Sequence, residues 1–134
     1  MDKQPQYEFS AALLIDDSET DNFLNSIILR NNNICDVIYT ATNVDLALRL
    51  FQALSPVTRP QLILLDMELP EKNGFNFIEA FEKLPKDITE GIKISIVSAH
   101  LQRHEWLFPL RNQHKHPYIF KVIEKPLTFE KLMH

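Results

Sequence analysis

The run Gln61-Leu62-Ile63-Leu64-Leu65-Asp66 decides the fold of this chain. Consecutive apolar residues followed by a carboxylate are typical of a strand buried on both faces, as in a parallel sheet that helices cover on each side. Three further runs, largely apolar, also end in polar residues: Ala11–Ile15 before Asp16-Asp17, Ile92–Val97 before Ser98, and Ile119–Ile123 before Glu124-Lys125. Ligands of open parallel sheets bind beyond the carboxyl ends of the strands. We therefore expect these polar side chains to converge on one pocket.

Stretches with helical periodicity separate the apolar runs, which is the pattern of βαβ units. Ser18 is the expected N-cap of a helix over residues 19–31, with Phe23, Ile27 and Ile28 on its inner face. The other expected elements are a strand from Cys35 to Tyr39, a helix capped by Thr42 or Asn43 that carries Val44, Ala47, Leu48, Phe51 and Leu54, a helix from about Gly74 that Pro85 stops, a loop to Gly91, and a final helix from about Thr128. Five strands alternating with five helices predict an α/β fold, a doubly wound parallel sheet with helices on both faces.

Length and composition fit one cytoplasmic domain. The chain has 134 residues, and we expect a polar tail over residues 1–9 followed by a single domain over residues 10–134. A net charge of −4 argues against a nucleic-acid partner, because such surfaces are normally basic. No apolar run is long enough to cross a membrane, and the first residues lack the apolar segment of a signal peptide. The single cysteine, Cys35, fits a reducing cytoplasm and a position in the core.

Asp16-Asp17 is a pair of adjacent carboxylates at the end of a predicted buried strand. Burial and mutual repulsion both disfavour two ionised carboxylates, so the pair needs a compensating charge. Mg²⁺ could supply it, since this cation binds a few carboxylates together with water and phosphate oxygens. One of the two carboxylates could instead cap the following helix. The pair alone favours neither interpretation.

Asp66 is followed by Pro70 and Gly74 in the spacing Asp-x-x-x-Pro-x-x-x-Gly, which predicts a tight loop into the next helix. An aspartate held there can attack phosphorus as a nucleophile, and the specific spacing makes an ordinary turn aspartate the weaker interpretation. Lys125, before Pro126, places an ammonium at the end of the fifth strand, where it can neutralise phosphoryl charge. A cis bond before Pro126 is compatible with that placement. The hydroxyl of Ser98 could bond a phosphoryl oxygen or serve as a simple cap.

In this order along the chain, the acidic pair, the Asp-x-x-x-Pro-x-x-x-Gly spacing, Ser98-Ala99 and Lys125-Pro126 resemble the receiver domain of bacterial two-component response regulators, including chemotaxis regulators. The resemblance covers residues 10–134 and implies the flavodoxin-like strand order 2-1-3-4-5. It also implies that the domain catalyses its own phosphorylation from a phosphohistidine of a sensor histidine kinase or a phosphotransfer protein. The phosphorylated domain would then signal through contacts with a downstream protein.

The resemblance assigns roles to individual acidic residues. Asp66 would be the phosphoacceptor. Asp17 and Asp66 would bind Mg²⁺ directly and Asp16 largely through water. The backbone carbonyl of Glu68 would complete the protein's share of the ligands.

The same resemblance gives Lys125 the role of pairing with the phosphoryl group and makes Ser98 the switch hydroxyl that moves onto it. Strand five of the family usually carries an aromatic switch residue three positions before the lysine. Here that position is Val122, and the nearby Phe120 and Tyr118 have a different spacing. The signalling face is therefore expected to depart from the family pattern, while the phosphorylation chemistry is retained.

The segment between Ser98 and Pro117 is longer than usual, with an expected helix near residues 106–110 that Pro109 interrupts. It contains the histidines His100, His104, His114 and His116. The i, i+4 spacing of His100 and His104 could bind a metal, but solvent-facing histidines are the favoured interpretation without nearby cysteines. By resemblance, His100 and Glu68 border the phosphorylation site, where they could tune dephosphorylation.

Three functions are compatible with these residues. The first is a stand-alone receiver that is phosphorylated and signals by protein contact, with no enzymatic activity beyond its own phosphorylation and dephosphorylation. The second is a non-phosphorylated pseudo-receiver that serves as a scaffold, against which the complete acidic set and Lys125 argue. The third is a small Mg²⁺-dependent phosphatase acting on metabolites, which would need a substrate-enclosing cap and a separate general acid.

Overall fold

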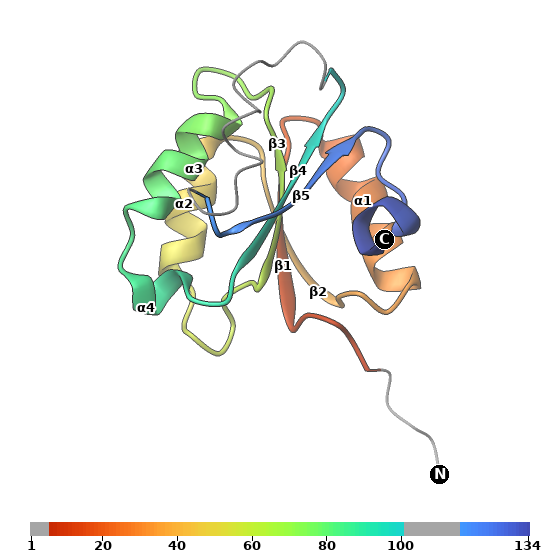
Figure 1. The fold of residues 1–134 in the computed structure, drawn as a ribbon, viewed down its shortest axis with the longest axis horizontal. Coiled ribbons are helices and arrows are strands. Elements are labelled where there is room, and N and C mark those ends of the chain that lie inside the picture. Colours follow the sequence, from red (N-terminus) through yellow and green to blue (C-terminus); the bar gives the residue numbers. More distant parts are fainter. Residues whose placement is uncertain (1–5, 101–115) are drawn as a thin grey trace.

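The computed structural model describes residues 6–100 and 116–134. Within them a single five-stranded sheet has the order β2-β1-β3-β4-β5, with every neighbouring pair parallel (Figure 1). The strands are β1 (Ala11–Ile15), β2 (Val37–Ala41), β3 (Leu62–Asp66), β4 (Lys93–Ser98) and β5 (Ile119–Glu124). This confirms the doubly wound, flavodoxin-like order that the resemblance implied.

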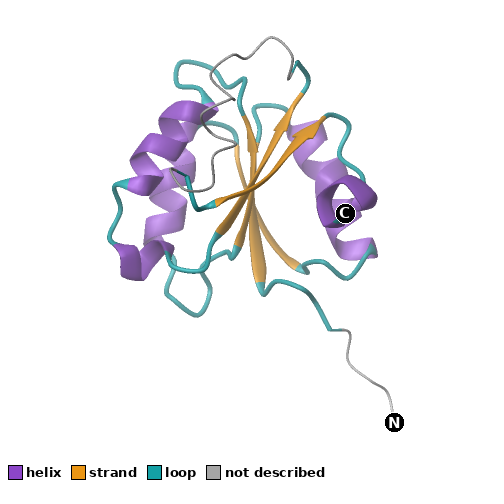
Figure 2. Cartoon of the chain, viewed as in Figure 1, coloured by secondary structure: helices purple, strands orange, loops and turns teal. Residues whose placement is uncertain are grey.

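Helices cover both faces of the sheet (Figures 1 and 2). They are α1 (Glu19–Asn31), α2 (Val44–Ala53), α3 (Gly74–Glu82), α4 (Lys86–Thr89) and α6 (Phe129–Met133). Among the described residues, none of them has the length and apolar composition needed to cross a bilayer. Helices α2, α3 and α4 lie on one side of the sheet, and α1 and α6 lie on the other.

Two hydrophobic cores follow from the alternation of side chains along each strand. In β1, Leu13 and Ile15 pack in the core beneath α2 and α3, while Ala12 and Leu14 pack in the core beneath α1. The predicted N-cap at Ser18 is confirmed, and Asn43, one of the two predicted candidates, caps α2. The final helix begins near Thr128 as predicted, and Thr128 is its N-cap. Burial of β1 and β3 on both faces agrees with their continuous apolar sequence.

The two edge strands are less buried than we predicted. Val37 in β2 is 47% exposed, and the middle of β5 is only half-buried. The physical reason is the strand order, because an edge strand has one neighbour and the helices cover it incompletely.

The C-terminus of α1 corrects the predicted start of β2. Asn33 has a positive φ of 55°, and its amide donates to the carbonyl of Arg30, while Ile34 donates to Leu29. These bonds form a Schellman motif, which ends the helix. Cys35 donates to the same Leu29 carbonyl, so it stays at the helix end, buried in the core. The strand therefore begins at Val37 rather than at Cys35.

The inner face of α1 also differs from the prediction. Phe23 is 63% exposed and Ile27 36% exposed, whereas Asn22, Ser26 and Leu29 are buried against the sheet. The helix is oriented so that the Asn22 amide reaches the backbone carbonyl of Asp16 at 3.0 Å. A polar anchor at the strand end thus overrides the apolar periodicity, and α1 is left with an exposed apolar face.

Helix α3 begins at Gly74 as predicted, but it ends at Glu82, before Pro85. Pro85 is instead the N-cap of the short helix α4, where we expected a loop. The helix expected near residues 106–110, and with it His104 and His114, lies outside the described residues, as do the first five residues of the expected tail.

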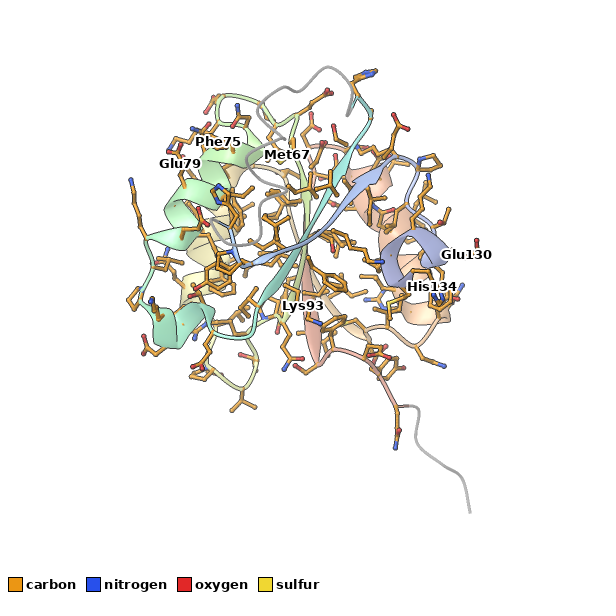
Figure 3. The ribbon with its side chains drawn as sticks, in the orientation of Figure 1. Met67, Phe75, Glu79, Lys93, Glu130 and His134 are labelled. Carbon is orange, nitrogen blue, oxygen red and sulfur yellow. The ribbon has the colours of Figure 1, made fainter. Side chains whose placement is uncertain are left out.

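Gly74 allows the loop after β3 to pack closely against α3, near Met67 and Phe75 (Figure 3). A Cβ atom at this position would lie 2.5 Å from the sulfur of Met67 and 2.9 Å from the carbonyl oxygen of Asp66. The Gly74 amide donates to the Met67 carbonyl at 3.1 Å. Because the carbonyl of Asp66 is backbone, the strand end itself would have to move to admit a side chain.

We expect Gly74→Ala to lower the free energy of unfolding by about 1–3 kcal/mol, the usual cost of overpacking a close contact. Chemical denaturation would measure it. Gly91→Asn is the matched control, because Gly91 has a positive φ of 79° but open space around its Cβ position, and Asn tolerates that backbone conformation. Equal stability of Gly74→Ala and the wild type would contradict this packing.

Candidate functional site

Three carboxylates meet at the carboxyl edge of the sheet, at the ends of the neighbouring strands β1 and β3. Asp16 and Asp17 follow β1, and Asp66 ends β3. One oxygen of each lies within 4.8 Å of the others. Asp16 and Asp66 are each 5% exposed, and Asp17 is exposed. The predicted convergence of strand ends is therefore observed for all three acids.

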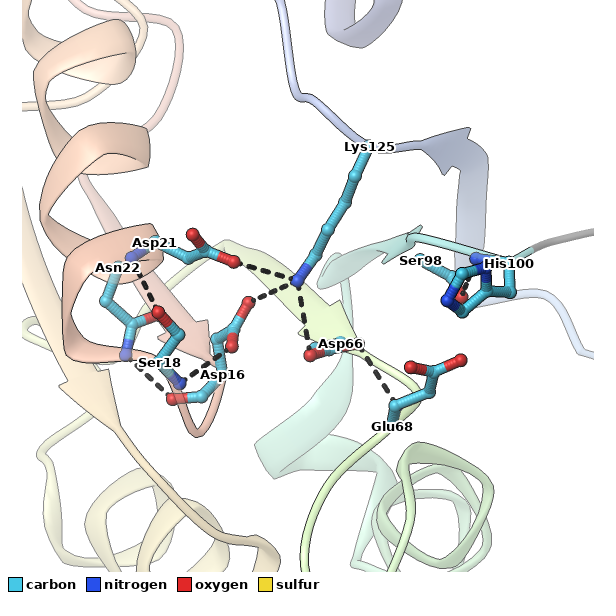
Figure 4. A network of polar contacts seen from close by, with 9 residues as sticks. All are labelled: Asp16, Ser18, Asp21, Asn22, Asp66, Glu68, Ser98, His100 and Lys125. Carbon is cyan, nitrogen blue, oxygen red and sulfur yellow. Dashed lines mark hydrogen bonds and ion pairs between the residues drawn. The ribbon is translucent and has the colours of Figure 1, made fainter.

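Lys125 directly follows β5, and its side chain extends toward Asp16 and Asp66 (Figure 4). Its ammonium donates to Asp16 Oδ2 at 3.0 Å, to Asp21 Oδ2 at 3.0 Å and to Asp66 Oδ2 at 3.4 Å. The backbone amide of Lys125 donates to the carbonyl of Ser98 at 2.8 Å, which ties the ends of β4 and β5 together. The bond to Pro126 is cis. One ammonium thus balances carboxylates from three elements.

In both Asp16 and Asp66, one carboxylate oxygen accepts from a backbone amide and the other faces Lys125. Oδ1 of Asp16 accepts from the amide of Ser18 at 2.9 Å, and Oδ1 of Asp66 accepts from the amide of Glu68 at 3.0 Å. In each residue Oδ2 faces the ammonium of Lys125. The backbone amides fix the orientation of both carboxylates, so that the second oxygen of each points into the site.

The pKa values of Asp66 and Lys125 are both raised, but for different reasons. Burial raises the pKa of Asp66 to about 6, and the nearby Asp16 adds to this, while the Glu68 amide and Lys125 oppose it. Burial lowers the pKa of Lys125, but the hydrogen bonds to Asp16 and Asp21 outweigh it and leave that pKa above its usual value. Without a divalent cation, the site therefore holds a charged lysine beside a carboxyl whose raised pKa makes it harder to ionise than an ordinary aspartate.

Ser98 and His100 lie at the adjacent end of β4. Ser98 is fully buried, and its hydroxyl accepts from the amide of His100 at 3.4 Å. The His100 side chain is exposed. Figure 4 shows Ser98 and His100 apart from the lysine cluster. The structure therefore brings Asp16, Asp17, Asp66 and Lys125 together, with the Ser98 hydroxyl at the margin.

Sequence reasoning missed two residues of α1 that contribute to the site. Asn22 is buried and donates to the Asp16 carbonyl, and its Oδ1 has no partner within the described residues. Asp21 donates its amide to Ser18 Oγ and presents its carboxylate to Lys125. The available signal was the Ser18 cap, because Cα–Cβ bonds in a helix tilt toward its N-terminus and so direct Asp21 toward the strand ends.

The aromatic residues of strand five take other roles. The hydroxyls of Tyr118 and Thr89 share a hydrogen bond of 2.7 Å, and the Tyr118 ring packs edge-on against Phe81. Tyr118 precedes β5 and so lies at the amino end of the strand, away from the carboxyl edge. Phe120 lies under the ammonium of Lys93, 4.5 Å from the ring centre, at an irregularity of the β4–β5 pairing. Val122 pairs with Ile96 in the sheet. Neither ring occupies the position next to the site.

Comparison with known proteins agrees with the fold. The model of the response regulator receiver domain family matches residues 12–134. No curated protein matches the chain at a significant level.

Solved structures of similar fold cover 92% of this chain. A two-component response regulator from Cytophaga hutchinsonii is 23% identical, with a TM-score of 0.78 and 91% of its own chain covered. A receiver domain from Methylobacillus flagellatus is 15% identical, with a TM-score of 0.71 and 92% covered. A chemotaxis response regulator of Vibrio cholerae is 22% identical, with a TM-score of 0.68 and 92% covered. At these identities the likeness shows the fold.

The raised pKa of Asp66 predicts a pH-dependent stability in the absence of divalent cations. Folding favours the neutral carboxyl of Asp66. Its contribution to stability is fully present below the pKa that Asp66 has in the unfolded chain, near 4, and is lost as the pH rises through the folded-state pKa of about 6. We therefore expect Asp66→Asn to be more stable than the wild type at pH 7.5 in chelator, by on the order of 2 kcal/mol. The difference should shrink toward pH 4.

Thermal unfolding of both proteins between pH 4 and 8 would measure this difference. Asp87→Asn, on the exposed first turn of α4, is the matched control and should show no such trend. A stability difference that does not vary with pH would mean that Asp66 ionises as an ordinary aspartate.

Proposed function

The chain belongs to the response regulator receiver domain family, whose members are signalling modules of two-component systems, and from this premise we propose that Asp66 is its phosphoacceptor. The donor would be a phosphohistidine of a sensor histidine kinase or of a phosphotransfer protein in the cytoplasm. The observation that carries the proposal is the Lys125 ammonium beside Asp66 and Asp16. The receiver domain itself would be residues 10–134, and it would signal by contacting a downstream protein.

The reaction needs little covalent chemistry from the protein. A carboxylate oxygen of Asp66 forms the new bond to phosphorus while the bond from phosphorus to the donor's imidazole nitrogen breaks, and the imidazole keeps the electron pair. Charge develops on the phosphoryl oxygens, where Lys125 can donate hydrogen bonds. Ser98, at the end of β4, is the hydroxyl we assign to the same oxygens once it moves toward them. Positioning and charge account for most of the catalysis.

The donor set fits a hard divalent cation. Asp16, Asp17 and Asp66 offer only carboxylate oxygens, clustered within 4.8 Å, and oxygen ligands of this kind suit Mg²⁺. We assign Asp17 and Asp66 as direct ligands, Asp16 as a ligand through water, and the Glu68 backbone carbonyl as a further ligand. Bound Mg²⁺ would neutralise charge on the acids and on the phosphoryl oxygens.

A protein donor also fits the surface beside the site. A cavity of about 570 Å³ opens next to Lys125 and is mostly apolar. It is lined by residues of α1 and of the turn after β5, namely Asp21, Leu24, Asn25, Ile27, Ile28, Lys125, Pro126 and Leu127. Leu24 is 52% exposed and the adjoining Phe23 is 63% exposed. Exposed apolar patches of this kind mark protein contacts, and this one borders the lysine of the site.

We expect the wild type to gain one phosphoryl group from acetyl phosphate and Mg²⁺, as measured by intact-protein mass spectrometry. Asp66→Asn should gain none, because the amide is not nucleophilic. A chelator should abolish labelling of the wild type, and Asp17→Asn should need more Mg²⁺ for the same labelling, since it lacks one carboxylate ligand.

Asp45→Asn is the control, because Asp45 is an exposed acid that pairs with Lys72 away from the cluster. It should be labelled like the wild type. Phosphate retained by Asp66→Asn would move the acceptor to another residue. A wild type that stays unlabelled would favour the scaffold function, and turnover of small phosphomonoesters would favour a phosphatase.

A further inference from the structure

Asp21 is a carboxylate beside the site that does not belong to the acidic cluster. Its Oδ2 lies 3.0 Å from the Lys125 ammonium, as close as that of Asp16 and closer than that of Asp66 at 3.4 Å. Its side chain is 40% exposed, against 6% for each of the other two partners. Asp21 thus holds the ammonium from the solvent side, on α1 (Figure 4).

The three carboxylates use the whole donor capacity of Lys125. An ammonium has three N–H groups, and Asp16, Asp21 and Asp66 each accept one hydrogen bond. A phosphoryl group on Asp66 brings new anionic oxygens, so Lys125 must give up a present bond to reach them. Asp16 and Asp66 lie inside the cluster, where a divalent cation would share their charge. Asp21 lies outside it and remains the competing partner.

We propose that Asp21 is a positioning residue that retains Lys125 on the α1 side of the site and competes with the phosphoryl group for its ammonium. This inference rests on the proposed phosphorylation of Asp66. Its consequence is that Asp21 opposes phosphorylation, in contrast to the other acids near the lysine. The phosphorylated form is therefore less favoured than it would be in a site that held the acidic cluster and Lys125 but no carboxylate at Asp21.

The expected size of the effect follows from exposure. A partly exposed ion pair changes an equilibrium by about twofold to fivefold. Without the Asp21 charge, Lys125 keeps Asp16 and Asp66 as partners, so the ammonium remains in the site. We therefore expect Asp21→Asn to bind beryllofluoride, a phosphoryl mimic, about twofold to fivefold more tightly in saturating Mg²⁺. The rate of phosphorylation by acetyl phosphate should rise by a similar factor in kcat with little change in KM.

Two further variants separate restraint of the lysine from simple loss of charge. Asp21→Glu keeps a carboxylate within reach of Lys125 and should restore affinity close to the wild-type value. Glu19→Gln removes an equal charge from the same first turn of α1, and Glu19 makes none of the ion pairs found among residues 6–100 and 116–134. It should also behave like the wild type.

A readout in the resting protein does not depend on phosphorylation. The ammonium protons of Lys125, observed by nitrogen-15 NMR, should exchange with water faster in Asp21→Asn than in the wild type, because one partner is lost. Glu19→Gln should leave that exchange rate unchanged.

Unchanged or weaker beryllofluoride binding by Asp21→Asn, with a wild type that binds it, would overturn this inference alone. An equal gain in Glu19→Gln would also overturn it, since charge rather than restraint would then be the cause. A wild type that binds no beryllofluoride would overturn the proposed function and this inference together.

Discussion

The ammonium of Lys125 is the interaction on which the site depends. Buried carboxylates at the ends of β1 and β3 repel each other and lose hydration, so the pair needs a positive charge nearby. Lys125 offsets that repulsion from across the sheet edge, at 3.0 Å from Asp16 and 3.4 Å from Asp66. The compensation is incomplete, because the pKa of Asp66 remains raised to about 6. A divalent cation would supply the rest of the charge.

The fold delivers these groups without relying on long loops. Parallel strands end at one edge of the sheet, and backbone amides two residues beyond Asp16 and Asp66 fix the orientation of each carboxylate. The close packing of Gly74 holds the strand end that carries Asp66. Ser98 ties the backbone of Lys125 to β4. The geometry of the site is therefore set by sheet register and short turns.

The strands and the strand-end residues were predictable because apolar runs and their polar ends are local features of the sequence. The inner face of α1 was not, because Asn22 anchors the helix to the Asp16 carbonyl, and this side-chain-to-backbone hydrogen bond outweighs the periodicity of Phe23 and Ile27. The start of β2 was also missed, since the Schellman motif at Asn33 is a backbone arrangement. Asp21 was not predicted because its partner, Lys125, is distant in the sequence, and only the folded sheet brings the two side chains together.

A crystal structure with Mg²⁺ and beryllofluoride would show directly whether Lys125 and Asp66 act together on a phosphoryl group. We predict beryllium bonded to one carboxylate oxygen of Asp66, Lys125 donating to a fluoride, and Mg²⁺ bound by Asp17, Asp66 and the Glu68 carbonyl, with Asp16 reached through water. A beryllofluoride bound elsewhere, or a Lys125 that keeps all of its present carboxylate bonds beside an occupied Asp66, would contradict it.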